Sequence, residues 1–277
     1  MRTRRSLPSP PLLEWGEGAP VLLLHGLGAS SHVYEPLRAC LPTGRRCVAV
    51  DLPHCGRAGA WAEDFSPRVL AERLAQLIAD RQLAEATVVG HSFGGLVALQ
   101  LAALGVTRRV LLLAAPVAGV GGLRAATGSG LARWTLRVAG HVEPSAPAVR
   151  AWLGMLWGEG PAPTAGMVQG YLYALSAAGH AAAMAQGLEA VAHFRVPCLP
   201  RGCRVELLLG ERDPLVTVDQ GRAFARASGA RLQVLEGVGH CIPEEAPERV
   251  AALLRRVPES GGGEGGMLTL GPCNGLE

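Results

Sequence analysis

The chain of 277 residues contains no lysine, so arginine supplies all 26 of its Lys-plus-Arg charges. Against 23 acidic residues these arginines leave a net charge of +3, an excess too small to predict a nucleic-acid or membrane surface. Aromatic residues are also scarce, at 4%, but 49% of the residues are hydrophobic, which excludes disorder over most of the chain. We therefore expect a folded protein without nucleic-acid or membrane partners.

Signals for export, membrane insertion and metal binding are lacking as well. A signal peptide needs an apolar run of roughly 7–15 residues, whereas Ser and Pro follow the arginines near the N-terminus. No stretch of about 18 apolar residues is free of polar interruptions, as a membrane-spanning helix would require. The 7 cysteines form no zinc-binding pattern with histidine, so we expect mostly reduced thiols in a cytoplasmic protein without a metal site. Cys198 and Cys203 are close enough for a local disulfide, but two unbridged thiols are the favoured interpretation.

Short apolar runs alternate with helical patterns along the chain. Runs that are apolar on both faces are typical of strands in a parallel sheet covered by helices, and they occur at residues 21–24, 47–50, 87–89, 110–113, 205–209 and 232–235. Helical patterns lie between or after them, at residues 66–81, 93–104, 217–228 and 247–257. This alternation predicts an α/β fold with a mostly parallel twisted sheet flanked by helices.

Residues 117–200 interrupt the alternation. They carry no strand pattern, and their apolar residues, punctuated by prolines, predict short amphipathic helices inserted between two strands of the sheet. The α/β core would then comprise residues 12–116 and 201–257. We expect a basic, disordered tail at residues 1–11 and a Gly-rich, disordered tail at residues 258–277.

The motif that most clearly carries chemistry is Gly-His-Ser-Phe-Gly-Gly at residues 90–95. It follows a β-branched strand pattern and opens the helical pattern that starts at Phe93, which is the context of a nucleophile elbow. Flanking glycines allow the sharp turn, and the turn lifts the hydroxyl of Ser92 above the sheet. The helix N-terminus behind it offers backbone N–H groups to a developing oxyanion. Ser92 is therefore the candidate nucleophile.

A serine nucleophile needs a base and an acid that orients the base, and both are found downstream. Asp213 follows the strand pattern at residues 205–209, and His240 follows the one at residues 232–235. His240 would take the serine proton, while Asp213 would hold the histidine tautomer and stabilise the imidazolium. Asp219 is a weaker candidate acid because it lies in the first turn of a predicted helix, where acids favour the helix dipole.

With these motifs the chain resembles the α/β-hydrolase fold superfamily, in the serine-nucleophile branch with a helical cap. The resemblance covers about residues 12–257 and rests on His25-Gly26 after a strand, the elbow at Ser92, Gly-x-x-Asp ending at Asp213 and Gly-x-Gly-His ending at His240. It implies that the backbone N–H groups of Leu27 and Phe93 form the oxyanion hole. It also implies that residues 117–200 are a cap or lid over the site.

Residues around the expected site follow the family less closely. The loop at residues 51–58 has His54 in place of the first glycine of the family motif and Ala58 in place of its serine. We expect His54 to be either a solvated loop residue, which is favoured, or part of the pocket mouth. We expect His25 and Gly26 to shape the loop beside the substrate. Trp134, Trp152 and Trp157 are candidates for an apolar acyl pocket, although they would also suit packing of the cap against the core.

The predicted function is hydrolysis of an ester of a small or medium apolar acid through an acyl-enzyme, with a small molecule as substrate and no metal or cofactor. A thioesterase, a carrier-protein methyl-ester esterase, a carbon–carbon bond hydrolase and a cofactor-free perhydrolase would use the same three side chains. A non-catalytic ligand receptor on this fold also remains open. Arg133 and Arg137 share a helix face that would suit an acidic carrier, but a solvated face is favoured. The oligomeric state stays undetermined, with a monomer as one possibility.

Overall fold

A computed structural model describes residues 10–41, 43–59, 61–62, 64–83, 85–119 and 144–256. Its sheet has 7 strands in the order β1-β3-β2-β4-β5-β6-β7. The strands are β1 (Leu12–Gly16), β2 (Ala19–Leu24), β3 (Arg45–Val50), β4 (Thr87–His91), β5 (Arg109–Leu113), β6 (Arg204–Gly210) and β7 (Arg231–Leu235). Only β1 pairs antiparallel, at one edge of the sheet. Each of the six predicted strands is present, and the short apolar stretch before them forms β1.

The inner strands of the sheet bury both faces over most of their length, which explains their apolar sequences, whereas the edge strands β1 and β7 are partly exposed. Along β2, Leu22 and Leu24 belong to one hydrophobic cluster, while Val21 and Leu23 belong to the other. The first cluster is completed by α2 (Pro67–Asp80), α3 (Phe93–Ala103) and α9 (Val218–Ser228). The second is completed by η1 (Ser31–Tyr34), α1 (Glu35–Cys40), α10 (Ile242–Glu245) and α11 (Pro247–Arg255). The sheet is therefore the middle layer between two layers of helices.

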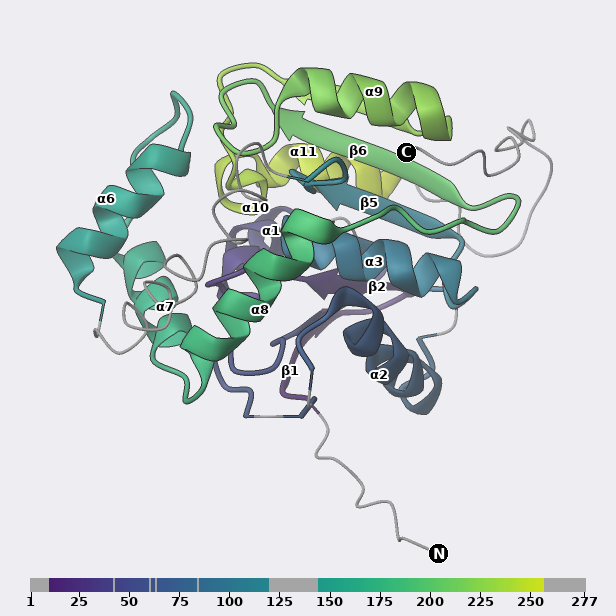
Figure 1. Ribbon diagram of the computed structural model, residues 1–277, viewed down its shortest axis with the longest axis horizontal. Helices are drawn as coiled ribbons and strands as arrows, with labels where there is room; N and C mark the ends of the chain where they lie inside the picture. The colour runs from purple at the N-terminus through teal and green to yellow at the C-terminus, as the bar shows by residue number, and fades with distance from the viewer. Residues whose placement is uncertain are drawn as a thin grey trace, which may run out of the picture.

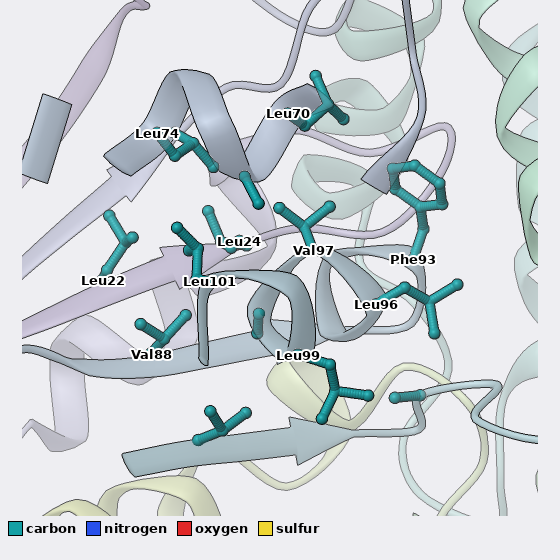
Figure 2. Packing of buried hydrophobic residues seen from close by; sticks show 14 of the residues in the cluster. Leu22, Leu24, Leu70, Leu74, Val88, Phe93, Leu96, Val97, Leu99 and Leu101 are labelled. Atoms are coloured by element: carbon teal, nitrogen blue, oxygen red, sulfur yellow. The ribbon is translucent and has the colours of Figure 1, made fainter. Parts of the chain in front are cut away.

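Helix α3 lies at the centre of the first cluster. It contacts β4, β5 and α2, and a few of its residues contact α8, so it has no face for solvent and its sequence is apolar nearly all round. Figure 2 shows this packing, with labelled residues from β2, β4, α2 and α3: Leu22, Leu24, Leu70, Leu74, Val88, Phe93, Leu96, Val97, Leu99 and Leu101. The position of α3 against β4 fixes the start of the helix, where Ser92 lies.

Local sequence signals account for the ends of several helices. Ser66 accepts a hydrogen bond from the amide of Val69 and begins α2, with Pro67 as its first residue. Thr217 and Gln220 form a capping box at the start of α9, and Gly229 ends that helix in the left-handed conformation. The short helices α1 and α10 were not predicted, because a helix of 6 or 4 residues is too short to show a hydrophobic period.

Three helices fill the described part of the predicted insertion: α6 (Ala146–Leu156), α7 (Ala165–Leu175) and α8 (His180–His193). No strand occurs among residues 117–119 and 144–200, which is what the sequence led us to expect of this stretch. In Figure 1 the arrows of β5 and β6 point toward the side on which α6 and α7 lie. The inserted helices therefore lie at the carboxyl end of the sheet, where the loops after β4, β6 and β7 meet.

Some expectations concern parts of the chain that the structure leaves undescribed, including Trp134, Arg133, Arg137 and the tails at residues 1–9 and 258–277. Cys203 is a buried free thiol, so a Cys198–Cys203 bridge is excluded, but Cys198 is disulfide-bonded, so the favoured interpretation of two unbridged thiols is wrong for Cys198. In the described part of the chain, no helix combines the length and apolar character needed to span a bilayer.

Candidate active site

Ser92 lies between the last residue of β4 and the first residue of α3. Its φ of 51° is in the left-handed region, which a serine adopts only where the surrounding structure enforces it. The amide of Ser92 donates to the carbonyl oxygen of Leu113 at 2.8 Å, which ties the turn to β5. The neighbouring glycines are needed because a Cβ at Gly90 would lie 2.4 Å from the carbonyl oxygen of Gly94. The turn therefore has the strand–elbow–helix geometry that the motif predicts.

The side chains of Ser92, His240 and Asp213 form a continuous hydrogen-bonded chain. The Oγ of Ser92 is 3.0 Å from Nε2 of His240, and Nδ1 of His240 is 2.8 Å from Oδ2 of Asp213. The other carboxylate oxygen of Asp213 accepts hydrogen bonds from the amides of Leu215 at 2.8 Å and Val216 at 3.0 Å. Because the ionised carboxylate can only accept, it keeps the proton on Nδ1 and leaves Nε2 free to receive the serine proton.

Asp219, the weaker candidate acid, lies elsewhere. It is in the first turn of α9, its side chain is 89% exposed, and it pairs with Arg222 at 3.1 Å. The structure therefore brings Asp213, and not Asp219, to His240.

The loop after β2 passes directly beside Ser92. A Cβ at Gly26 would be 3.0 Å from the Cβ of Ser92, so only glycine lets the loop approach this closely. Phe93 is the first residue of α3, and its N–H has no acceptor within the helix. The loop that leads to Leu27 and the first residue of α3 therefore both lie next to Ser92, where the resemblance expects an oxyanion hole.

His25 shapes this loop through its ring. Its Nε2 accepts a hydrogen bond from the amide of Leu52 at 2.9 Å, so Nδ1 carries the proton and donates to the carbonyl oxygen of Gly26 at 2.8 Å. Burial lowers the pKa of His25, which favours this neutral form. Both ring nitrogens are thus engaged by the backbone, and His25 joins the loop after β2 to the loop after β3.

His91 supports the backbone of His240. Its Nε2 donates to the carbonyl oxygen of His240 at 2.9 Å, and the two rings lie 5.2 Å apart. Burial, together with the neighbouring His240, lowers the pKa of His91 to about 3, so its ring stays neutral. The elbow residue before Ser92 therefore helps to hold the residue that serves as candidate base.

The inserted helices cover the loop at residues 26–28. A Cβ at Gly28 would meet side-chain atoms of Met184 at 2.9 Å, Leu175 at 3.5 Å and Trp152 at 3.7 Å. The side chain of Leu27 packs against α8, where a Cβ at Gly187 would lie 2.4 Å from it. These contacts surround the candidate oxyanion loop with apolar side chains from α6, α7 and α8.

The described tryptophans of the insertion differ in position. Trp152 lies against Gly28 and packs edge-on against Tyr171, with ring centroids 5.7 Å apart. The indole of Trp157 instead donates to the carbonyl oxygen of Pro161 at 2.9 Å, within its own segment. Of the two tryptophans proposed for an acyl pocket that the structure describes, Trp152 is the one whose ring lies beside the loop near Ser92.

His54 makes a contact that the favoured interpretation did not anticipate. It has a φ of 59°, and its Nδ1 donates to the carbonyl oxygen of Ala178 at 2.8 Å, in the turn between α7 and α8. The family motif has glycine at this position, and glycine would adopt the left-handed conformation without strain. His54 thus joins the loop after β3 to the inserted helices instead of standing free in solvent.

Several polar residues around the site gave no signal in the sequence. The hydroxyl of Tyr171 in α7 donates to Glu244 at 2.7 Å, and Glu245 accepts hydrogen bonds from backbone amides on both sides of His240. Burial raises the pKa of Glu244 to about 8. Two adjacent glutamates before a helix resemble an ordinary acidic first turn, so nothing in the sequence distinguishes them. Among the described residues, no group of three or more His, Cys, Asp or Glu side chains is placed to bind a metal ion.

Comparison with known proteins identifies the family. A family model described as "Alpha/beta hydrolase family" matches residues 21–253. The chain belongs to the alpha/beta hydrolase family. The resemblance drawn from the four motifs is thereby confirmed, as is the fold.

Individual alpha/beta hydrolases are similar over shorter stretches. An esterase of Mycobacterium tuberculosis is 41% identical over 95 residues, which cover 33% of this chain and 31% of that protein. A pimeloyl-[acyl-carrier protein] methyl ester esterase of Photobacterium profundum is 36% identical over 104 residues, or 36% of this chain and 39% of that protein. The matches thus span only about a third of these relatives.

Solved alpha/beta hydrolases share the fold over most of the chain. The esterase from Exiguobacterium antarcticum superposes with a TM-score of 0.71 and 19% sequence identity, over 88% of this chain and 93% of that one. At this identity the similarity concerns the fold alone.

Proposed function

We propose that this alpha/beta hydrolase is a serine hydrolase that cleaves a carboxylic ester of a small or medium apolar acid through an acyl-enzyme. The observation that carries the proposal is the hydrogen-bonded chain from Ser92 through His240 to Asp213. Family membership and similarity to proteins named esterases support the same class of reaction.

In the proposed acylation step, the Oγ of Ser92 attacks the ester carbonyl while Nε2 of His240 takes its proton. The resulting imidazolium is stabilised by Asp213, and it then returns the proton to the leaving alkoxide as the tetrahedral intermediate collapses. Water repeats the sequence on the acyl-enzyme and releases the acid and free Ser92. The mechanism requires no metal and no organic cofactor.

The amides of Leu27 and Phe93 are proposed to bind the oxyanion of the tetrahedral intermediate. Both are backbone groups in rigid positions, one in the loop closed by His25 and one at the start of α3. Preorganised N–H donors of this kind stabilise charge that develops only in the transition state.

The acyl group is proposed to lie against Trp152, Leu175 and Met184. These side chains approach Gly28, next to the proposed oxyanion hole, and they come from the three inserted helices. Their apolar character favours an acid without charges near its carbonyl group. The insertion would then act as the cap of the enzyme.

The decisive experiment is Ser92→Ala, assayed on a chain-length series of nitrophenyl esters and acyl thioesters. Alanine fits the elbow, so we expect a folded protein without esterase activity, and a fluorophosphonate probe should label Ser92 alone. Full activity in Ser92→Ala, or labelling of another serine, would refute the proposal. Ligand binding without turnover in the parent protein would favour a receptor instead.

Hydrolysis of a carrier-bound methyl ester is a second candidate, because the relative from Photobacterium profundum is named for this activity. The two proposals differ in their dependence on the carrier. A methyl ester attached to acyl carrier protein should be cleaved with a much higher kcat/KM than the same free ester if the second candidate is correct.

A further inference from the structure

We propose that Glu245 is a positioning residue for His240, and that it couples the location of this base to the inserted helix α6. The proposal rests on the proposed function, because it assigns Glu245 a part in orienting the same histidine. The role assigned to Glu245 is therefore to position another residue, not to act on the ester itself.

The carboxylate of Glu245 accepts hydrogen bonds from three backbone amides. One oxygen binds the amides of Gly239 at 2.9 Å and Gly158 at 2.7 Å, and the other binds the amide of Cys241 at 3.0 Å. Gly239 and Cys241 are the residues immediately before and after His240. Glu245 therefore holds the backbone on both sides of the base.

The amide of His240 itself is bound by the inserted helices and not by Glu245. It donates to the carbonyl oxygen of Leu156, the last residue of α6, at 2.7 Å. Three consecutive amides, from residue 239 to residue 241, are thus held by only two partners, Glu245 and Leu156. Glu245 also binds the amide of Gly158. Both partners therefore connect the histidine loop, which comprises residues 237–241, to the end of α6.

The two segments touch without space for side chains. A Cβ at Gly158 would lie 2.0 Å from the carbonyl oxygen of Gly237, and a Cβ at Gly239 would lie 2.3 Å from the carbonyl oxygen of Leu156. A further hydrogen bond, from the amide of Glu159 to Gly237 at 2.7 Å, continues the contact. Displacement of the segment after α6 would therefore be transmitted directly to the backbone of His240.

Only a carboxylate satisfies this arrangement. All three partners are donors, and an ionised carboxylate is a group that only accepts. Glutamine at position 245 would have to turn its NH₂ group toward at least one of these amides. Burial raises the pKa of Glu245, whereas the three amide hydrogen bonds and the nearby His240 favour the charged carboxylate.

The adjacent Glu244 provides a matched control on the same short helix. It accepts a hydrogen bond from the hydroxyl of Tyr171 at 2.7 Å. Burial raises the pKa of Glu244 to about 8, so it is mostly uncharged at pH 7. Glu244→Gln therefore preserves both charge and shape at neutral pH, whereas Glu245→Gln removes a charge and one acceptor.

The test compares Glu245→Gln and Glu244→Gln at pH 7, by kcat, KM and the second-order rate of Ser92 labelling with a fluorophosphonate. We expect Glu245→Gln to lower both kcat and the labelling rate by about tenfold or more with little change in KM, since a misplacement of about 1 Å can cost about a hundredfold. Glu244→Gln should stay within about twofold of the parent protein. Rates are expressed per folded molecule, so a purely structural effect would leave the labelling rate unchanged.

A second pair of variants tests the coupling to α6 and leaves both glutamates in place. Gly158→Ala should lower the labelling rate, because its methyl group collides with the histidine loop. Gly160→Ala should not, because no atom lies within 4 Å of its Cβ position. This pair of glycine variants tests the coupling between α6 and His240 even if Glu245→Gln does not fold. Parent rates in Gly158→Ala, or equal losses in the two glutamate variants, would overturn the proposal.

The ring nitrogen resonances of His240 separate this proposal from the proposed function. They should move in Glu245→Gln and Gly158→Ala, and not in Glu244→Gln and Gly160→Ala, whether or not the protein hydrolyses esters. Unchanged resonances in all four variants would refute the positioning role. Absence of Ser92 labelling in the parent protein would instead refute the proposed function.

Discussion

At the scale of single residues, His240 is held both by its ring and by the backbone around it. Asp213 binds its ring, His91 binds its carbonyl oxygen, Leu156 binds its amide, and Glu245 binds the amides on either side. These partners come from segments before, within and after the inserted helices. The ring therefore has little freedom to leave the position between Ser92 and Asp213.

The first prediction concerns the acid. Asp213→Asn should lower kcat by about 10³–10⁴-fold, because an amide next to Nδ1 no longer enforces the tautomer that accepts the serine proton. Asp219→Asn should stay near the parent rate, because Asp219 is exposed and pairs with Arg222 instead of His240. Steady-state kinetics with a nitrophenyl ester checks both. A severe loss in Asp219→Asn with none in Asp213→Asn would reverse the assignment.

At the scale of elements, the inserted helices belong to both hydrophobic clusters. Buried residues of α6 and α7, such as Leu153 and Tyr171, join the second cluster, while Ala183 and Val191 of α8 join the first. The sheet separates these clusters, so the insertion bridges both layers at the carboxyl end of the strands. The apolar residues that approach Gly28 lie at this bridge.

The second prediction concerns Trp152 in α6. An apolar wall contributes about 0.8 kcal/mol per buried methylene, so kcat/KM should rise by up to about fourfold per added acyl carbon until the wall is covered. Trp152→Ala should move the optimum to longer acyl chains and leave the labelling of Ser92 nearly unchanged. Trp157→Ala is the control, because its indole is bound to Pro161. Rates that are flat across the series in the parent protein and unchanged by both substitutions would leave these tryptophans with a packing role only.

At the scale of the whole molecule, buried titratable groups make stability depend on pH. Glu244 has a pKa of about 8 in the folded protein, compared with an ordinary value of 4.5. Its neighbours are Tyr171, from whose hydroxyl it accepts a hydrogen bond, and the side chains of Glu245 and Cys241. Burial is the main cause, because ionisation would place a charge where water cannot reach it.

The third prediction follows from this raised pKa. Between about pH 5 and pH 8, unfolding Glu244 releases a proton, so this residue makes the free energy of unfolding fall as pH rises, by up to about 1.4 kcal/mol per pH unit. In Glu244→Gln the side chain at position 244 does not titrate, so unfolding releases no proton there. The stability of the variant relative to the parent protein should therefore increase from pH 5 to pH 8 and level off above it. Urea unfolding at several pH values measures the difference, and a constant difference would contradict the prediction.

The sequence alone predicted six of the described strands, the longer helices of the α/β core and the three candidate catalytic side chains. Strands buried on both faces must be apolar throughout, and helix ends such as Ser66 and Thr217 need a side chain that can accept a backbone hydrogen bond, so both leave a local pattern. The elbow at Ser92 is likewise local, because its glycines are required by the turn itself. Asp213 and His240 could be located because each follows a recognisable strand.

Only the tertiary structure revealed how His240 is held. Glu245 meets Gly158 across 87 positions of the chain, and His54 meets Ala178 across 124. In both contacts a side chain binds a backbone group, and every residue other than proline carries the same backbone N–H and C=O groups. Such a contact requires nothing of the partner's side chain, so it leaves no pattern from which it could be predicted before the segments are brought together.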